Sequence, residues 1–156
     1  MATKFFDNIR NHETNYDITD VIRYQKEDVG RFVLRIMIGG LMLFHGVHKI
    51  LYGTEMVTQT LQNAGIPSMF TFGVFLGEVI GPIMMIVGYK TRIGAAFVVL
   101  DMITAVLLVH VTQITLLNEG GGLMIELNLL YLMGAIAVLF LGSGSIAISK
   151  GKGVLD

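Results

Sequence analysis

The sequence of 156 residues contains no cysteine, no tryptophan and only two prolines. The lack of cysteine excludes a disulfide framework, a thiolate metal site and a thiol–disulfide relay within the chain. Charged residues make up 15% of the sequence, whereas a soluble domain usually carries about 25%. The net charge of −1 offers no electrostatic surface for nucleic acid. These shortages argue against a disordered chain, a nucleic-acid-binding protein and most water-soluble enzymes.

Hydrophobic residues fill the deficit, at 53% of the chain, and they fall in long blocks. A transmembrane helix needs about 20 mostly apolar residues. Four segments meet this requirement, and each is bounded by glycine, proline or charge: residues 31–51, 69–88, 92–116 and 123–141. The connections are short, which favours antiparallel neighbours. The sequence therefore predicts an all-α integral membrane protein, folded as a four-helix up-down bundle.

Basic residues predict how this bundle is oriented. Six of the 11 lysines and arginines lie at or before the start of the first span: Lys4, Arg10, Arg23, Lys26, Arg31 and Arg35. Four more lie in the second connection and the tail: Lys90, Arg92, Lys150 and Lys152. Only Lys49 falls on the other side. Since positive residues are enriched on the cytoplasmic side of membrane proteins, both termini are predicted to be cytoplasmic.

Three regions follow from this reading. Residues 1–30 form a polar cytoplasmic segment, residues 31–148 the transmembrane domain, and residues 149–156 a cytoplasmic tail. Four apolar residues of the first region fall at helical spacing: Ile18, Val21, Ile22 and Val29. They predict a short amphipathic helix that lies against the bundle or the inner interface. A docking surface for a cytoplasmic partner is the alternative.

Seven ionisable side chains fall inside the expected spans: His45, His48, Lys49, Glu78, Asp101, His110 and Glu126. Each charged group costs about 2.5–3.5 kcal/mol near a helix centre on insertion scales. Such groups persist when they are paired, hydrated or used. At about 1.5 Å of rise per residue, all but Asp101 lie in the outer half of the membrane.

Helical spacing divides these residues between two surfaces. His45, His48 and Lys49 share one helix face, whereas Asp101 and His110 lie on opposite faces of theirs. We name the first surface the outer-leaflet cluster, and expect it to contain His45, His48, Lys49, Glu78, His110 and Glu126. The second surface holds Asp101 and Asn128. These two either hydrogen-bond across a helix pair or form a proton path or subunit interface.

The outer-leaflet cluster has a structural and a functional interpretation. It is either an ion-pair network in which Lys49 and the histidines neutralise Glu78 and Glu126, or a binding pocket. A pocket of this kind suits a quinone, because its carbonyl oxygens need hydrogen-bond donors and its reduction needs protons, which histidine and glutamate can pass. The expected catalytic residues are His45, Lys49, Glu78, His110 and Glu126. The expected cofactor-binding residues are His45, His48, Lys49, Glu78 and His110.

Two further cofactors fit the same residue types. Histidine and carboxylate side chains ligate zinc or iron, and the candidate ligands are His45, Glu78, His110 and Glu126. Two histidines on facing helices can also bracket a haem. Within the second span, Gly73, Gly77 and Gly81 form a small-residue stripe suited to close helix packing, and Pro82 should kink the helix near Glu78.

Several motifs resemble the DoxX family of membrane proteins. They are residues 35–39 (RIMIG), 43–49 (LFHGVHK), 77–81 (GEVIG), 88–95 (GYKTRIGA), His110, 126–131 (ELNLLY) and 142–145 (GSGS). The resemblance covers residues 31–148 and implies a four-helix protein of a bacterial or archaeal inner membrane. It also implies a link to redox chemistry, since some members are subunits of thiosulfate:quinone oxidoreductases. The motif positions correspond here to His45, Lys49, Glu78, Arg92, His110 and Glu126.

Three functions are compatible with these observations. The leading one is a membrane redox subunit that binds a quinone or similar acceptor in an outer-leaflet pocket, as part of a sulfur-compound:quinone oxidoreductase type of complex. The second is a metal- or haem-binding membrane protein that uses the same residues. The third is a non-catalytic anchor or assembly partner for a soluble redox enzyme. The expected partners are the lipid bilayer, a small molecule, a redox protein and a second copy of the chain, but not nucleic acid.

Overall fold

The computed structural model describes residues 18–156, so most of the predicted N-terminal segment lies outside the described residues. The described part is helical and contains no β-strand, only an isolated bridge between Leu117 and Leu123. Its α-helices are α2 (Ile18–Tyr52), α3 (Glu55–Asn63), α4 (Gly81–Val87), α5 (Thr91–Leu108) and α6 (Glu126–Leu141). Its shorter turns are the 3₁₀ segments η1 (Ser68–Gly73) and η3 (Val111–Gln113) and the π-helical segment η2 (Leu76–Ile80). The predicted all-α class is confirmed for these residues.

Three segments are long and apolar enough to cross a membrane: Ile22–Tyr52, Ser68–Val87 and Thr91–Leu108. The fourth apolar helix, α6, has 16 residues, which corresponds to about 24 Å. That is shorter than the hydrocarbon core of about 30 Å. The chain is therefore an integral membrane protein, and the crossing by α6 stays a prediction.

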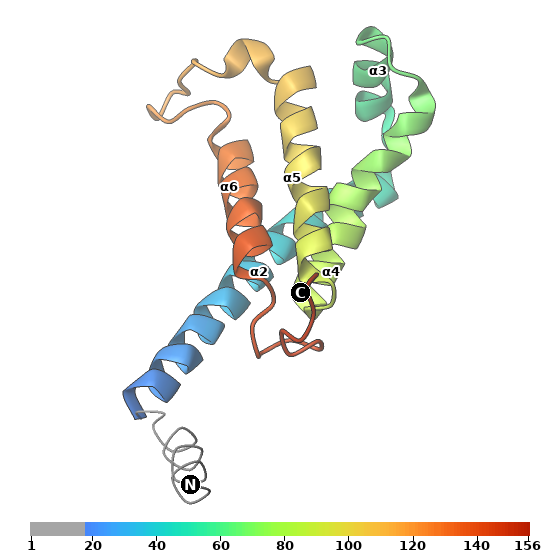
Figure 1. Ribbon diagram of the computed structural model, residues 1–156. Coiled ribbons are helices and arrows are strands. Elements are labelled where there is room, and N and C mark those ends of the chain that lie inside the picture. The colour runs from blue at the N-terminus through green and yellow to red at the C-terminus, as the bar shows by residue number, and fades with distance from the viewer. Residues whose placement is uncertain (1–17) are drawn as a thin grey trace, which may run out of the picture.

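The long helix α2 corrects the expectation of a separate short helix before the first span. One continuous helix of 35 residues runs from Ile18 to Tyr52 and crosses the expected boundary at residue 30. No proline interrupts this stretch. Arg31 is 3.2 Å from Asp28 and 3.8 Å from Glu27, so ion pairs at helical spacing support the helix across the boundary. In Figure 1 the first turns of α2 project beyond the other helices.

The third and fourth apolar segments are also shorter than expected. Helix α5 ends at Leu108 rather than near residue 116, and α6 begins at Glu126 rather than at residue 123. After α5 the backbone tightens into a 3₁₀ turn, where the amide of Gln113 donates to the carbonyl of His110 over 2.8 Å. Consequently His110 lies in the connection after α5, and Glu126 is the first residue of α6.

The helices pack around α5, which contacts α4, η2 and α6, while α2 crosses beside α4, η2 and α6 (Figure 1). The buried core is formed by Met42, Met85, Ala95, Val98, Met102, Tyr131, Ala135 and Val138. Helices α4 and α5 meet at Gly81 and Gly94: a Cβ atom on Gly94 would lie 2.6 Å from the carbonyl oxygen of Gly81. Small residues at this crossing therefore allow the two backbones to touch.

Arg35 connects α2 to α4 and to the C-terminal segment. Its side chain is fully buried, and it donates to the carbonyl oxygens of Met85 over 2.8 Å and Ile146 over 2.5 Å. The segment that contains Ile146 folds back under α4, where the amide of Ile148 donates to the carbonyl of Val87 over 3.3 Å. From the sequence, Arg35 is a basic flank and the start of a DoxX-like motif, whereas the structure shows that it joins α2, α4 and the C-terminal segment.

We expect Arg35→Met to lower the free energy of unfolding by about 3 kcal/mol, because two charge-assisted hydrogen bonds are lost and two carbonyls lose their donor. Arg23→Met is the matched control, since Arg23 is exposed on the projecting part of α2. Unfolding of both variants by denaturing detergent, followed by circular dichroism, measures the difference. Equal stability of the two variants would contradict the role assigned to Arg35.

Candidate functional site

A cavity of about 570 Å³ lies between α3, η1, η2 and α5, beside the last turn of α2. Most of its wall is apolar. The apolar side chains include Val57, Leu61, Phe70, Val74, Phe97 and Leu108. Pockets of about 300–1,000 Å³ with apolar walls and a few polar groups are typical of small-molecule sites. This cavity has the size and the lining of such a site.

The charged groups of the cavity are Lys49, Glu78 and Asp101. They come from three elements: the last turn of α2, the π-helical segment η2 and the middle of α5. The Lys49 ammonium donates to both carboxylate oxygens of Glu78. The Glu78 side chain is 8% exposed and that of Lys49 is 23% exposed. Because an isolated charge is expensive to bury, this ion pair is what allows Glu78 to lie inside the protein.

The irregular backbone around Glu78 has a chemical cause. Proline lacks an amide hydrogen, so Pro82 cannot donate to the carbonyl of Glu78 as a residue four positions later would in an α-helix. The chain forms the π-helical segment instead, with the Gly81 amide bonded to the carbonyl of Leu76. Helix α2 approaches at this point, since a Cβ atom on Gly46 would collide with the carbonyl oxygen of Glu78. Segments of this type are frequent at functional sites.

Asp101 lies against Gly77, where an added Cβ atom would collide with the Asp101 side chain. Its Oδ2 atom is buried and has no hydrogen-bond partner within residues 18–156. The sequence analysis assigned Asp101 to a second surface with Asn128. The structure instead places it in the same cavity as Lys49 and Glu78. The contact of Gly81 with Gly94 sets the register of the two antiparallel segments, and this register brings Gly77 opposite Asp101.

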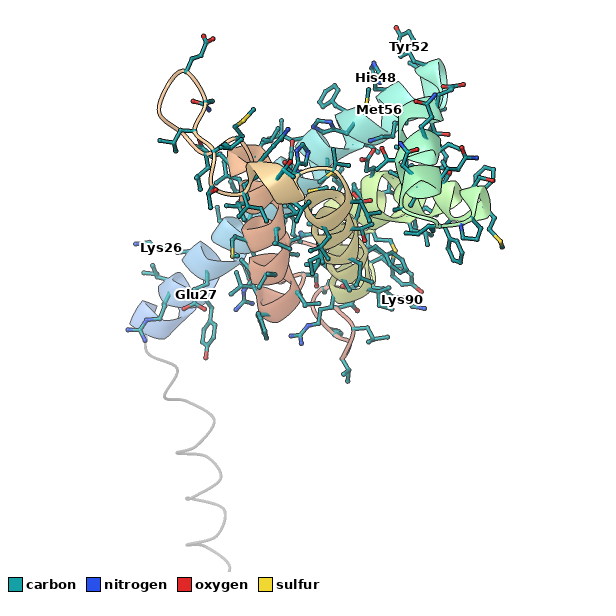
Figure 2. The ribbon with its side chains drawn as sticks, turned by 90° about the horizontal axis from the view of Figure 1, so that it is seen from above. Lys26, Glu27, His48, Tyr52, Met56 and Lys90 are labelled. Carbon is teal, nitrogen blue, oxygen red and sulfur yellow. The ribbon has the colours of Figure 1, made fainter. Side chains whose placement is uncertain are left out.

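The structure disperses the rest of the outer-leaflet cluster. The ring of His45 packs edge-on against Tyr131, with 5.8 Å between centroids, and His48 packs on Tyr52 at 4.7 Å. His110 Nδ1 lies 2.7 Å from Gln113 Oε1, and Glu126 is exposed at the start of α6. In Figure 2 His48 and Tyr52 stand at the outside of the molecule. Of the six residues, Lys49 and Glu78 line the cavity and the other four do not.

The predicted metal ligands do not form a metal site. Across residues 18–156, no three histidine, aspartate or glutamate side chains come close enough together to hold a metal ion. Zinc and iron sites built from such side chains need at least three protein ligands around one point. His45, Glu78, His110 and Glu126 therefore do not fit a shared metal ion. A haem between two histidines stays a prediction.

Comparison with known proteins gives the chain a family. The DoxX family profile matches residues 30–111, which is just over half of the sequence. The chain belongs to the DoxX family. Every residue that lines the cavity lies inside the matched segment, whereas Glu126 lies outside it.

Several curated proteins are similar over most of their length. "Putative oxidoreductase CatD" of Bacillus subtilis is 27% identical, over 80% of this chain and 91% of its own. An uncharacterized protein of Haemophilus influenzae is 30% identical, over 75% of this chain and 86% of its own. The uncharacterized membrane protein Rv3486 of Mycobacterium tuberculosis is 26% identical, over 75% and 77%. No solved structure matches.

The pairing of Lys49 with Glu78 can be tested by stability. We expect Lys49→Met to lower the free energy of unfolding by about 3 kcal/mol, because it leaves the buried Glu78 carboxylate uncompensated. Glu78→Gln should cost less, since the remaining Lys49 ammonium is the more exposed partner. The double variant Lys49→Met/Glu78→Met should recover most of the loss. Unfolding in mixed detergent measures all three, and additive effects would contradict the pairing.

Proposed function

We propose that the protein is a membrane redox subunit that binds a quinone, or a similar uncharged acceptor, in the cavity between α3, η1, η2 and α5. The observation that carries the proposal is the cavity itself: an apolar volume of about 570 Å³ with an ion pair and a carboxyl group in its wall. An apolar ring and tail would lie against the phenylalanine and leucine side chains. The carbonyl oxygens of the acceptor would lie toward Lys49, Glu78 and Asp101.

Access from the membrane favours a lipid-soluble ligand. Large apolar residues at the rim of the cavity are strongly exposed, with Met56 at 81% and Phe70 at 59%. In a bilayer such side chains would contact acyl chains rather than water, so a ligand dissolved in the membrane could reach the cavity sideways. In this proposal the electrons come from a partner protein with a redox cofactor, and Lys49 and Glu78 bind and orient the acceptor. Membership of the DoxX family and the name given to CatD support a redox role.

Co-purification of quinone tests this proposal. The wild-type protein, purified in mild detergent, should release quinone on solvent extraction. Gly73→Leu should reduce the quinone content at least about tenfold, because Gly73 lines the cavity and an added Cβ atom there meets nothing within 4 Å. A leucine at this lining position is therefore accommodated without a collision at its Cβ atom, and we expect its side chain to take up volume at the cavity wall.

Gly40→Leu provides the matched control. Gly40 also has open space around an added Cβ atom, but it does not line the cavity. This variant should keep the wild-type quinone content. Quinone-free wild-type protein, or equal content in Gly73→Leu, would contradict the proposal. A quinone-free protein that co-purifies with a soluble redox enzyme would instead support the function of a membrane anchor.

We also propose that the chain crosses an inner membrane four times and has both termini in the cytoplasm. Arg35 and Arg92 both donate to carbonyl oxygens of the C-terminal segment, so these basic residues lie together at one end of the helix bundle. The connection between α5 and α6 lies at the other end, as does α3 (Figure 1). The charged residues of that connection are limited to Glu119. This asymmetry agrees with the enrichment of positive residues on the cytoplasmic side.

The lack of native cysteine allows a clean test of the orientation. We expect Glu119→Cys to react with a membrane-impermeant maleimide in intact cells. Lys150→Cys should react only in inside-out vesicles or after permeabilisation. The wild-type chain serves as the unlabelled control because it has no thiol. The reverse labelling pattern would contradict the proposed topology, and labelling of both positions from one side would contradict the crossing by α6.

A further inference from the structure

The third charged residue of the cavity, Asp101, has no part in the ion pair. Lys49 from α2 and Glu78 from η2 are its ionisable neighbours in the cavity wall, and α3, η1, α4 and α6 contribute no ionisable side chain to that wall. The wall therefore combines two carboxyl groups with one ammonium group. Lys49 is bonded to Glu78, so the charge of Glu78 is compensated and that of Asp101 is not.

The other polar side chains of the wall already have partners. The Thr60 hydroxyl donates to the carbonyl of Met56 over 2.8 Å, and that of Thr104 donates to the carbonyl of Leu100 over 2.8 Å. Asp101 differs, because its Oδ2 atom is shielded from solvent and has no partner in the described part of the chain. A buried polar atom without a partner is rare in native proteins and calls for an explanation.

A proton on Asp101 supplies that explanation. An ionised carboxylate without a hydrogen-bond donor is costly in apolar surroundings, and a second negative charge beside Glu78 adds repulsion. The protonated carboxyl avoids both costs. It also becomes a hydrogen-bond donor, which is what an uncharged carbonyl oxygen requires. Because Oδ2 is shielded beside Gly77, the donor toward the cavity would be an O–H on the other carboxyl oxygen, Oδ1. Gly77 holds this group close to the ion pair, because a larger residue there would displace it.

We propose that Asp101, in its protonated form, is the residue that recognises the ligand, by donating a hydrogen bond to an uncharged carbonyl oxygen. This inference rests on the proposed function and narrows it. The cavity would accept neutral carbonyl compounds and reject carboxylates, since Lys49, the one cation among the described residues that line it, is already bonded to Glu78. Asp101 would also hold a proton next to the oxygen that must gain one when a quinone is reduced.

Two variants separate the effect of the hydrogen-bond donor from the effect of side-chain size. Asp101→Asn keeps the size and a neutral N–H donor, whereas Asp101→Ala removes the donor. The probe is a benzoquinone with a ten-carbon tail, titrated into the purified protein in mild detergent. We expect the dissociation constant to stay within about threefold in Asp101→Asn and to rise about tenfold in Asp101→Ala, as for the loss of one hydrogen bond. At alkaline pH the wild type should bind more weakly, and Asp101→Asn should not change.

A second measurement examines the proton without any ligand. The infrared spectrum of the wild type at neutral pH should contain the C=O stretch of a protonated carboxyl group, and Asp101→Asn should lack it. Absence of that band in the wild type would overturn the inference, as would equal quinone affinity of the wild type and Asp101→Ala. Failure of the wild type to bind quinone would overturn the proposed function together with the inference. Quinone binding that is insensitive to Asp101 would overturn the inference alone.

Discussion

Close packing at three glycine residues sets the geometry of the candidate site. Gly46 lets α2 reach the carbonyl of Glu78, Gly77 lets Asp101 lie against η2, and Gly94 lets α5 touch the carbonyl of Gly81. In lipid, helices associate through such packing rather than through the hydrophobic effect. A methyl group at any of these positions would separate the elements that carry Lys49, Glu78 and Asp101. The cavity and its charged wall therefore depend on the absence of a side chain at these three glycines.

The chain handles buried charge in three different ways. The two terminal nitrogens of the Arg35 guanidinium donate to backbone carbonyls of α4 and the C-terminal segment, while its Nε is buried without a partner in residues 18–156. Lys49 and Glu78 satisfy each other. Asp101 has an oxygen with no partner within residues 18–156. The first two arrangements stabilise the fold because each charged group takes part in at least two hydrogen bonds within the protein. The third places a carboxyl group with one shielded, unpartnered oxygen in the wall of a largely apolar cavity, and a few polar groups in an apolar wall are typical of binding sites.

Hydropathy predicted the helical class and the approximate place of each apolar segment, because the blocks of apolar residues are long and well separated. It could not predict where α5 ends, since residues 109–116 are apolar enough to continue a helix but form a 3₁₀ turn at His110. Nor could it predict the continuity of α2 across residue 30, because the polar residues of its first turns are as compatible with a separate element. The family assignment from motifs is confirmed by the profile match.

The site was harder to predict than the fold. The depth of each residue in the membrane could be estimated from the sequence, but the rotation of one helix relative to another could not. The predicted outer-leaflet cluster therefore contains four residues that do not line the cavity. His45 turns toward Tyr131 on α6, while Lys49, one turn later, reaches Glu78. Asp101 was placed on the wrong surface. A usable signal was present: pairing the glycine stripe of 73–81 antiparallel with Gly94 and Asp101 brings Asp101 beside Glu78. Arg35 gave no such signal, because its partners are backbone atoms.

The bond from Arg35 to the carbonyl of Ile146 spans 111 positions of the sequence. During synthesis α2 leaves the ribosome early, and its arginine must wait in the membrane until the last apolar helix has followed. Water or a lipid phosphate group would have to solvate the guanidinium for that interval. The Arg35–Ile146 hydrogen bond can therefore form only after the C-terminal segment has been synthesised. A chain truncated before Ile146 would leave the Arg35 guanidinium without this acceptor.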